Sequence, residues 1–266
     1  MFDCIKEVLL TGMERVSAKA ARVRKSRLLR GDRAWLIPPW IDAVAPRRQN
    51  GQGTLGERIY QALKRDIIRG FYPQGEALNE SVLSQVYGAS CTPIREAAAR
   101  LEQDNLLRIV PNRGYFVSSP TIGWWNGIFE YCAAIEGAGA ELAARRGTDK
   151  KLLDDLARLA TTEYVTNDRR SYERFIAADT ALHIGIARLT CNRMLIRAVS
   201  DVRCHMERLM YASIDIGYFG GAPVQEHSEI ITAIFNRDVD LARRLTCDHI
   251  LQSRGKTTAN GKLFPV

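Results

Sequence analysis

The sequence predicts a mainly α-helical protein in two parts: an N-terminal winged helix-turn-helix with a small β-hairpin as its wing, and a C-terminal antiparallel bundle of six or seven helices. Two observations predict this fold class. Signals for short capped helices and a hairpin fall within residues 54–119, and almost no strand signal follows them. The chain has 266 residues, of which 46 % are hydrophobic, so each part can bury a core.

The first 53 residues are set apart by their composition. They hold 11 Lys/Arg against five Asp/Glu, and therefore most of the net charge of +8, together with a Pro-Pro pair and a polar, Gly-containing end. We expect residues 1–53 to form a flexible basic leader. It either attracts phosphates without sequence preference or has no specific role, and the second interpretation is favoured.

An amphipathic helix is predicted directly after the leader. Leu55, Ile59, Leu63 and Ile67 recur at every fourth position and give one apolar face, which ends at Gly70. A Pro/Gly turn follows this helix and leads to the most informative segment of the chain.

Two short helices separated by a tight turn form a predicted helix-turn-helix. The first covers Asn79–Tyr87 and ends at Gly88. The second is expected to begin with Thr92 as its N-cap and Pro93 at its first position, where the missing N–H would be unpaired anyway. Arg95 then lies in the first turn, where a guanidinium can reach a phosphate or a guanine edge.

The wing follows the second helix. We expect that helix to end near Asp104, with Asn105 as a left-handed cap. β-Branched and aromatic residues at 106–110 and 115–117 flank a turn at 111–114, which is the pattern of a β-hairpin. Residues 54–119 are therefore predicted to form one DNA-binding domain.

The remaining chain carries helical patterns separated by short breaks. We assign residues 120–255 to an all-helical domain and residues 256–266 to a frayed tail. The expected helices are 122–146, 149–166, 170–189, 192–215, 223–236 and 238–253. No apolar run approaches the roughly 18–20 residues of a membrane span. Six scattered cysteines without Cys-x-x-Cys spacing favour reduced thiols, so we expect a cytoplasmic protein with no membrane partner.

Several motifs occur in a characteristic order. In the first domain they are Ile67-Ile68-Arg69-Gly70, Leu78-Asn79-Glu80, Ser90 to Ala98, Leu101-Glu102 and Asn112 to Val117. This order resembles the winged helix-turn-helix of GntR-family transcription regulators. In the second domain they are Glu130, Ile135-Glu136, Ala143-Ala144, Ala178-Asp179, His183 and Asn192. They resemble the FCD effector domain of the FadR subfamily, over about residues 122–253.

The resemblance implies a ligand-responsive transcription regulator rather than an enzyme, with a double-stranded DNA operator as its partner. One recognition helix covers only a half-site of a few base pairs, so we expect a homodimer on an inverted repeat. A repressor is expected, whose operator affinity changes when a small organic acid effector binds the helical domain. The alternative is a metal-dependent small-molecule hydrolase or lyase.

Six residues are expected to contact DNA. They are Arg95, Thr92, Ser90, Ser81, Asn112 and Arg113. Arg95 is the main candidate because of its place at a helix start within the family motif. The alternatives are a surface salt bridge of Arg95 with Glu96 or another neighbour, and a solvated turn for Arg113.

Four residues of the helical domain match the metal site of the FadR subfamily in type and order: Asp179, His183, His227 and His249. Asp179 and His183 are four positions apart, so they share one face of a helix. Three imidazoles and one carboxylate suit a divalent transition metal, with Zn²⁺ expected and Ni²⁺, Fe²⁺ or Mn²⁺ as alternatives. The other interpretation is that each histidine is an ordinary hydrogen-bonded residue.

Two departures from the family concern recognition. Cys91 stands where most members have an arginine that contacts DNA, which changes affinity or base preference at that position. Cys132 stands where an arginine is common in the effector domain. Arg203 and His205 are then the candidates for binding the effector, with a solvated helix face and an ordinary hydrogen-bonded histidine as the alternatives.

Overall fold

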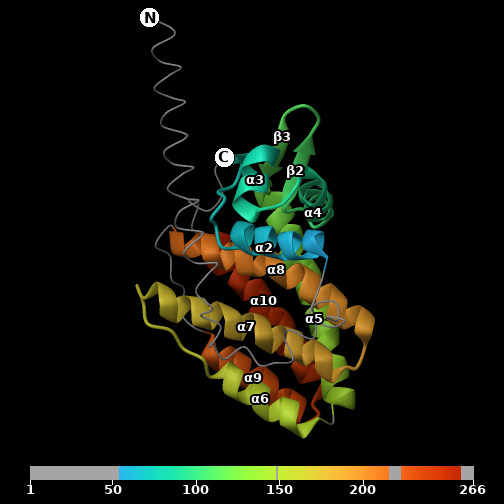
Figure 1. Ribbon diagram of the computed structural model, residues 1–266. Helices are drawn as coiled ribbons and strands as arrows, with labels where there is room; N and C mark the ends of the chain where they lie inside the picture. The colour runs from blue at the N-terminus through green and yellow to red at the C-terminus, as the bar shows by residue number, and fades with distance from the viewer. Residues whose placement is uncertain (1–53, 148, 216–222, 259–266) are drawn as a thin grey trace, which may run out of the picture.

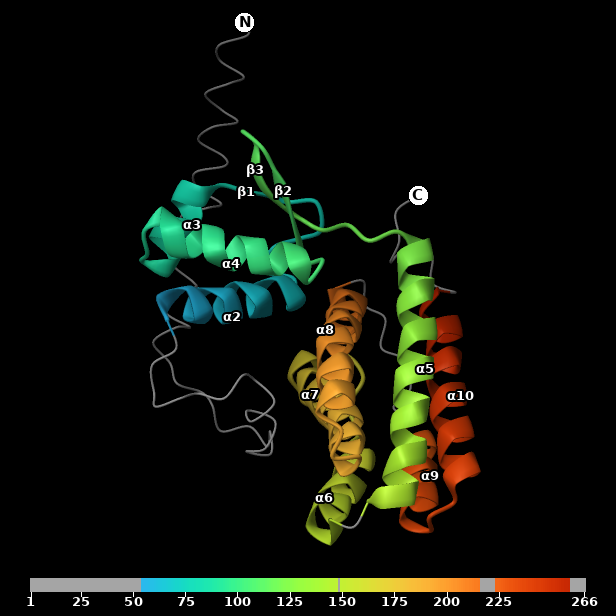
Figure 2. The same ribbon diagram turned by 90° about the vertical axis from the view of Figure 1, so that its right-hand side faces the viewer.

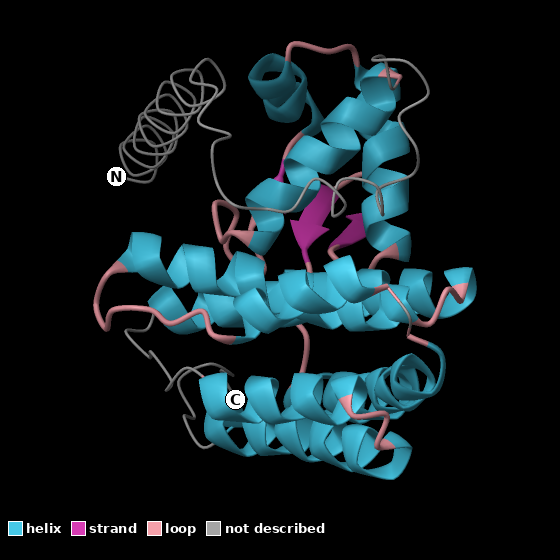
Figure 3. Ribbon diagram, turned by 90° about the horizontal axis from the view of Figure 1, so that it is seen from below, coloured by secondary structure: helices cyan, strands magenta, loops and turns pink. Residues whose placement is uncertain are grey.

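The computed structural model describes residues 54–147, 149–215 and 223–258. Its architecture is the one expected: a small winged domain seated at one end of a helical bundle (Figure 1). The strands are confined to the winged domain (Figure 3). The expected leader and the end of the expected tail lie outside the described residues.

The winged domain combines three helices with a small antiparallel sheet of strand order β1-β3-β2. Its elements are α2 (Leu55–Ile68), β1 (Ala77–Leu78), α3 (Glu80–Tyr87), α4 (Cys91–Gln103), β2 (Leu107–Val110) and β3 (Gly114–Val117). The hairpin is confirmed, with Val110 opposite Gly114. Strand β1 was not predicted from the sequence, and its Leu78 pairs with Tyr115. Gly114 is required at this point, because its φ is +93° and a Cβ there would lie 3.0 Å from the Leu78 carbonyl oxygen.

The core of the winged domain lies between α2 and α4. On α2, Ile59, Leu63 and Ile67 are buried, as the four-residue spacing predicts. On α4, the buried residues are Ile94, Ala97, Ala98 and Leu101. Leu55 is an exception: it is the first residue of α2 and is 41 % exposed.

The start of α4 differs from the sequence prediction. The helix begins at Cys91 and Ser90 is the N-cap residue, so Thr92 as N-cap was wrong. Pro93 lies at the third helical position. It is tolerated there because the first four N–H groups of a helix have no partner within the helix. The other expected caps are confirmed, since Gly88 and Asn105 have φ values of 61° and 56°.

The second domain is a bundle of antiparallel helices. They are α5 (Ile122–Arg146), α6 (Lys150–Ala160), α7 (Arg169–Leu189), α8 (Arg193–Asp215), α9 (Val224–Phe235) and α10 (Val239–Thr258). Two boundaries differ from expectation. Helix α6 ends at Ala160 rather than near 166, and the Ser171 hydroxyl accepts from the Val165 N–H in the connection that follows. Helix α10 continues to Thr258, so the expected tail is helical at its start.

Helix α8 joins the bundle to the winged domain. Figure 2 shows α2 lying across one end of α8, with α5 and α10 side by side on the other flank of the bundle. Ile68 of α2 packs into a cluster with Phe175 of α7 and with Cys204 and Tyr211 of α8. None of the helices in the described ranges has the length and apolar character of a membrane span.

Candidate DNA-binding surface and metal centre

Arg95 lies exposed in the first turns of α4 and is held by Glu80 of α3. Its Nε donates to Glu80 Oε2 over 3.0 Å, and its Nη2 donates to Oε1 over 2.9 Å. The Tyr115 hydroxyl of the wing donates to Glu80 Oε2 over 2.8 Å. The hydrogen bonds from Arg95 lower the pKa of Glu80 to about 2, so the carboxylate stays charged. The partner of Arg95 is thus a neighbour on α3, and the pair ties α3, α4 and the wing together.

The other residues expected to contact DNA are exposed at three places. Ser90 and Thr92 lie at the start of α4, while Asn112 and Arg113 lie at the tip of the wing. Ser81 is exposed in the first turn of α3, and its hydroxyl donates to the Asn79 side chain over 2.7 Å. The candidate DNA-binding surface thus consists of exposed polar side chains at the N-terminal ends of α3 and α4 and at the tip of the wing.

Cys91 is the first residue of α4 and is exposed. Its Sγ lies 3.7 Å from the hydroxyl of Ser84. The thiol therefore occupies the edge of the candidate DNA-binding surface where the family has an arginine, and it brings no positive charge to that edge.

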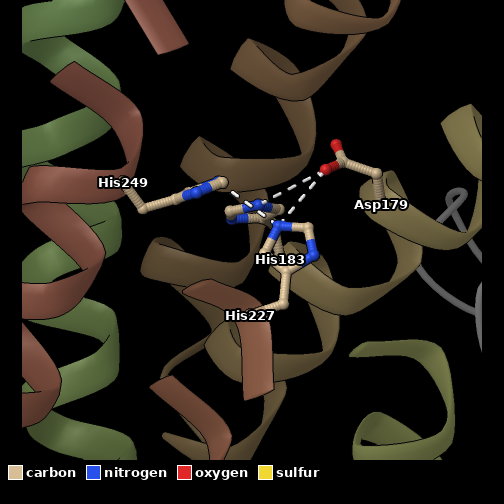
Figure 4. Close-up of side chains that lie close together, drawn as sticks. All are labelled: Asp179, His183, His227 and His249. Carbon is tan, nitrogen blue, oxygen red and sulfur yellow. Dashed lines mark hydrogen bonds and ion pairs between the residues drawn. The ribbon is translucent and has the colours of Figure 1, made fainter. Parts of the chain in front are cut away.

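The structure brings the four expected metal ligands together in the bundle. Asp179 and His183 come from α7, His227 from α9 and His249 from α10, and all four are only 2–6 % exposed. One ligand atom from each residue lies within 4.8 Å of the others. The closest pair is Nε2 of His227 and Nε2 of His249, 3.3 Å apart, and Asp179 Oδ1 lies 3.5 Å from His227 Nε2 (Figure 4).

Two further carboxylates support the histidines from outside this centre. Glu136 Oε2 of α5 lies 2.5 Å from His183 Nδ1, although not in the alignment of a hydrogen bond. Glu226 Oε2 of α9 lies 2.7 Å from His249 Nδ1. Carboxylates at Nδ1 leave Nε2 of each ring toward the centre, which is the arrangement of metal-binding histidines.

The protonation states also fit a metal ion. Burial lowers the pKa of His227 to about 3 and lowers the pKa of His183 well below its ordinary value, so both rings are neutral. Burial works to raise the pKa of Asp179, but Arg203 and the histidines more than offset it, and the carboxylate is charged. Among the residues that the structure describes, the buried His183 Nε2 has no hydrogen-bond partner. Neutral imidazoles, one carboxylate and an unsatisfied ring nitrogen are the donors that a transition metal requires.

Of the two residues expected to bind an effector, the structure brings only Arg203 to this centre. Arg203 is 3 % exposed, forms an ion pair with Asp179, and has its Nη1 3.7 Å from Glu136 Oε1. Cys132 is buried beside the same pair of charges, and burial is the main cause of its raised pKa. His205 lies elsewhere, with its ring centroid 4.9 Å from that of Trp124.

Sequence reasoning gave no role to Glu136 or Glu226. Glu136 lies in a run rich in alanine and glycine, but Glu141 lies in the same run and is only half-buried, so the sequence alone did not single out Glu136. Gly137 beside it shows how tightly this part of α5 is packed, since a Cβ there would lie 2.4 Å from the sulfur of Cys247 on α10. Glu226 gave no signal either, because it begins a helix where an acid is common.

A winged helix-turn-helix joined to a bundle with a buried polar centre defines a DNA-binding regulator that has a separate ligand-binding domain. Residues 55–117 match the bacterial regulatory proteins of the gntR family, and residues 127–252 match the FCD domain. The chain belongs to the GntR family of transcription regulators, as the sequence motifs indicated. It is a regulator and not an enzyme, so the alternative of a hydrolase or lyase is not supported.

Relatives and solved structures agree with this assignment. The chain is 32 % identical over 126 residues to an HTH-type transcriptional regulator of Agrobacterium vitis, which covers 47 % of the chain and 74 % of the relative. It is 25 % identical to the HTH-type transcriptional repressor RspR of Escherichia coli K12, over 74 % of the chain and 86 % of the relative. A GntR regulator structure from Rhodococcus sp. RHA1 matches with a TM-score of 0.65 at 21 % identity, over 77 % of this chain and 98 % of that one, and supports the fold.

Proposed function

We propose that the protein is a cytoplasmic, metal-containing repressor of the FadR subfamily that binds an inverted-repeat operator as a homodimer. A small organic acid bound in the helical domain changes its affinity for the operator. The observation that carries this proposal is the convergence of Asp179, His183, His227 and His249 in the bundle. Relatives include a protein named as a transcriptional repressor, which supports the mode of regulation.

Arg95 reads the operator in this proposal. Glu80 holds the guanidinium through two hydrogen bonds, and the wing residue Tyr115 holds Glu80. An arginine fixed in this way reaches a guanine edge or a phosphate with little loss of side-chain freedom. The DNA backbone on either side of this contact is bound by Ser90, Thr92, Ser81, Asn112 and Arg113. A single α4 covers few base pairs, so two copies are needed on an operator.

The metal ion is held by Asp179 and the three histidines, with Zn²⁺ expected. When bound, the ion supplies a positive centre that attracts a carboxylate of the effector. Glu136 and Glu226 orient the rings of His183 and His249. Arg203 neutralises the outer oxygen of Asp179 and adds a second cation to the same region. A small carboxylate therefore suits this part of the bundle.

The proposal is tested by metal analysis together with operator titration. The purified chain is expected to carry close to one equivalent of a divalent transition metal per subunit, and His227→Ala is expected to lose it. His205→Ala is the matched control, since His205 is also buried but lies against Trp124. Loss of metal in both variants, or in neither, would contradict the assignment of the centre.

A further inference from the structure

Arg208 is a buried cation without an acidic partner in the part of the chain that the structure describes. It lies on α8, is 4 % exposed, and donates from Nη2 to the carbonyl oxygen of Ser118, 2.5 Å away. Its Nη1 is buried and has no hydrogen-bond partner within residues 54–147, 149–215 and 223–258. Arg203, five positions earlier, is equally buried but pairs with two carboxylates. Arg208 therefore has hydrogen-bonding capacity that the fold leaves unused.

This state is unfavourable for a charged side chain. A guanidinium carries five N–H donors, and burying it without a counter-ion loses solvation that one backbone carbonyl does not replace. Burial lowers the pKa of Arg208 to about 10, so the group is still protonated at neutral pH. A buried guanidinium with a free Nη1 offers two parallel donors to a carboxylate once its backbone acceptor moves aside.

A groove of about 470 Å³ lies next to Arg208, between the wing and the linker to α5. Ser118, which binds Arg208, is part of its wall. Trp124 and Phe116 give the groove two aromatic surfaces. Arg108 also lines it, with its guanidinium carbon 5.7 Å from the centroid of the Phe116 ring. The groove thus combines flat apolar surfaces with positive charge.

His205 is a second buried group behind the same wall. It is 7 % exposed, and its ring meets that of Trp124 edge-on at 4.9 Å. Its Nδ1 has no hydrogen-bond partner. Burial lowers the pKa of His205 to about 4, so the ring is neutral. Behind Ser118 and Trp124, two polar side chains more than nine-tenths buried thus retain unsatisfied nitrogen atoms.

We propose that the groove between the wing and the linker is a second ligand site, which binds a small aromatic carboxylate. The ring lies against Trp124 and Phe116, and the carboxylate replaces the Ser118 carbonyl as the acceptor for Arg208. This site is separate from the metal centre and goes beyond the function proposed above. Because Ser118 belongs to the linker, a bound carboxylate also releases the linker from α8.

Calorimetric titration of the full, metal-loaded chain with benzoate tests the proposal, with benzamide as the neutral analogue of the same shape. Benzoate is expected to bind saturably, and benzamide at least about tenfold more weakly. Arg208→Gln is expected to weaken benzoate at least about tenfold, since it removes the charge. His227→Ala is expected to leave benzoate affinity unchanged, because it alters only the metal centre.

Thermal melting of each variant shows whether it folds. Should Arg208→Gln fail to fold, Phe116→Ala in the half-buried wall of the groove provides the second test, with an expected severalfold loss of benzoate affinity. The proposal is overturned if benzoate gives no saturable heat at millimolar concentration, or if benzamide binds equally well. It is also overturned if His227→Ala abolishes binding, or if the folded Arg208 and Phe116 variants both bind as the unmodified chain does.

Discussion

The candidate DNA-binding surface and the metal centre are built in opposite ways. The first uses exposed residues close together in sequence, and the Arg95 side chain at its middle is 68 % exposed. The second joins three helices, and its four ligands are 2–6 % exposed although every one is polar. Exposed charges are screened by water, whereas buried ones must be compensated. We therefore expect substitutions in the candidate DNA-binding surface to change operator binding with little effect on folding stability. Substitutions in the buried cluster should change both operator binding and folding stability.

The largest expected effect on stability is that of Asp179→Ala. It removes the nearer of the two carboxylates that pair with Arg203 and leaves the buried guanidinium with only the longer contact to Glu136. Breaking a buried pair in this way costs about 3–5 kcal/mol. Denaturant unfolding of the metal-free chain measures the loss. Asp155→Ala, which breaks the exposed pair with Arg158 on α6, is the control and should change stability by no more than about 1 kcal/mol.

Arg95→Ala should have a large effect on operator binding and a small effect on stability. We expect operator affinity to fall about tenfold to a hundredfold, because a contact to a guanine edge or a phosphate is lost, while the free energy of unfolding falls by no more than about 1 kcal/mol from loss of the exposed pair with Glu80. Fluorescence anisotropy with a duplex from the protein's own promoter region measures the affinity. Arg158→Ala, an exposed arginine at the far end of the bundle, should leave affinity unchanged (Figure 1). An equal loss in both variants would point to non-specific charge attraction instead.

The Glu80 carboxylate should titrate near pH 2, in line with its lowered pKa of about 2. Since the pKa is depressed in the folded chain, the stabilisation from the pair with Arg95 is present above the ordinary carboxyl pKa and disappears as the pH falls toward 2. Carbon-detected NMR of the side-chain carboxyl group measures this midpoint. In Arg95→Ala the midpoint should move back up toward the ordinary value, and a wild-type midpoint near 4 would contradict the pairing.

Pro93→Ala should have the smallest effect. Pro93 lies at the third position of α4, where a backbone N–H would have no acceptor within the helix. The substitution therefore acts mainly by giving the unfolded chain more conformational freedom. We expect a loss of less than about 1 kcal/mol in denaturant unfolding. A much larger loss would mean that the proline itself fixes the start of the recognition helix.

The sequence predicted most of the winged domain because its signals are local. Periodic apolar residues marked α2, and Gly88 and Asn105 marked helix ends. It missed β1, a strand of two residues whose existence depends on pairing with β3 far along the chain. It also placed the start of α4 too late, because Thr92 and Ser90 are equally good caps by residue type.

The four candidate metal ligands were predicted from motif order, whereas the residues that surround them were not. The resemblance to the family's metal site indicated the four ligands, and packing of α5 against α7 decides that Glu136 reaches His183. The bond from Arg208 to Ser118 joins positions 90 apart in sequence, for which no pattern exists. Contacts of this kind depend on how helices cross, which one sequence does not reveal.

Helix α8 gives these two regions a common support. Arg203 and Arg208 are five residues apart on it, or roughly 7.5 Å along its axis. Arg203 contacts the buried Asp179, whereas Arg208 contacts Ser118 in the linker between the wing and α5. A continuous helix is a stiff rod on that scale. A displacement of this part of α8 therefore moves both arginines together, which links the buried acids to the linker between the wing and α5.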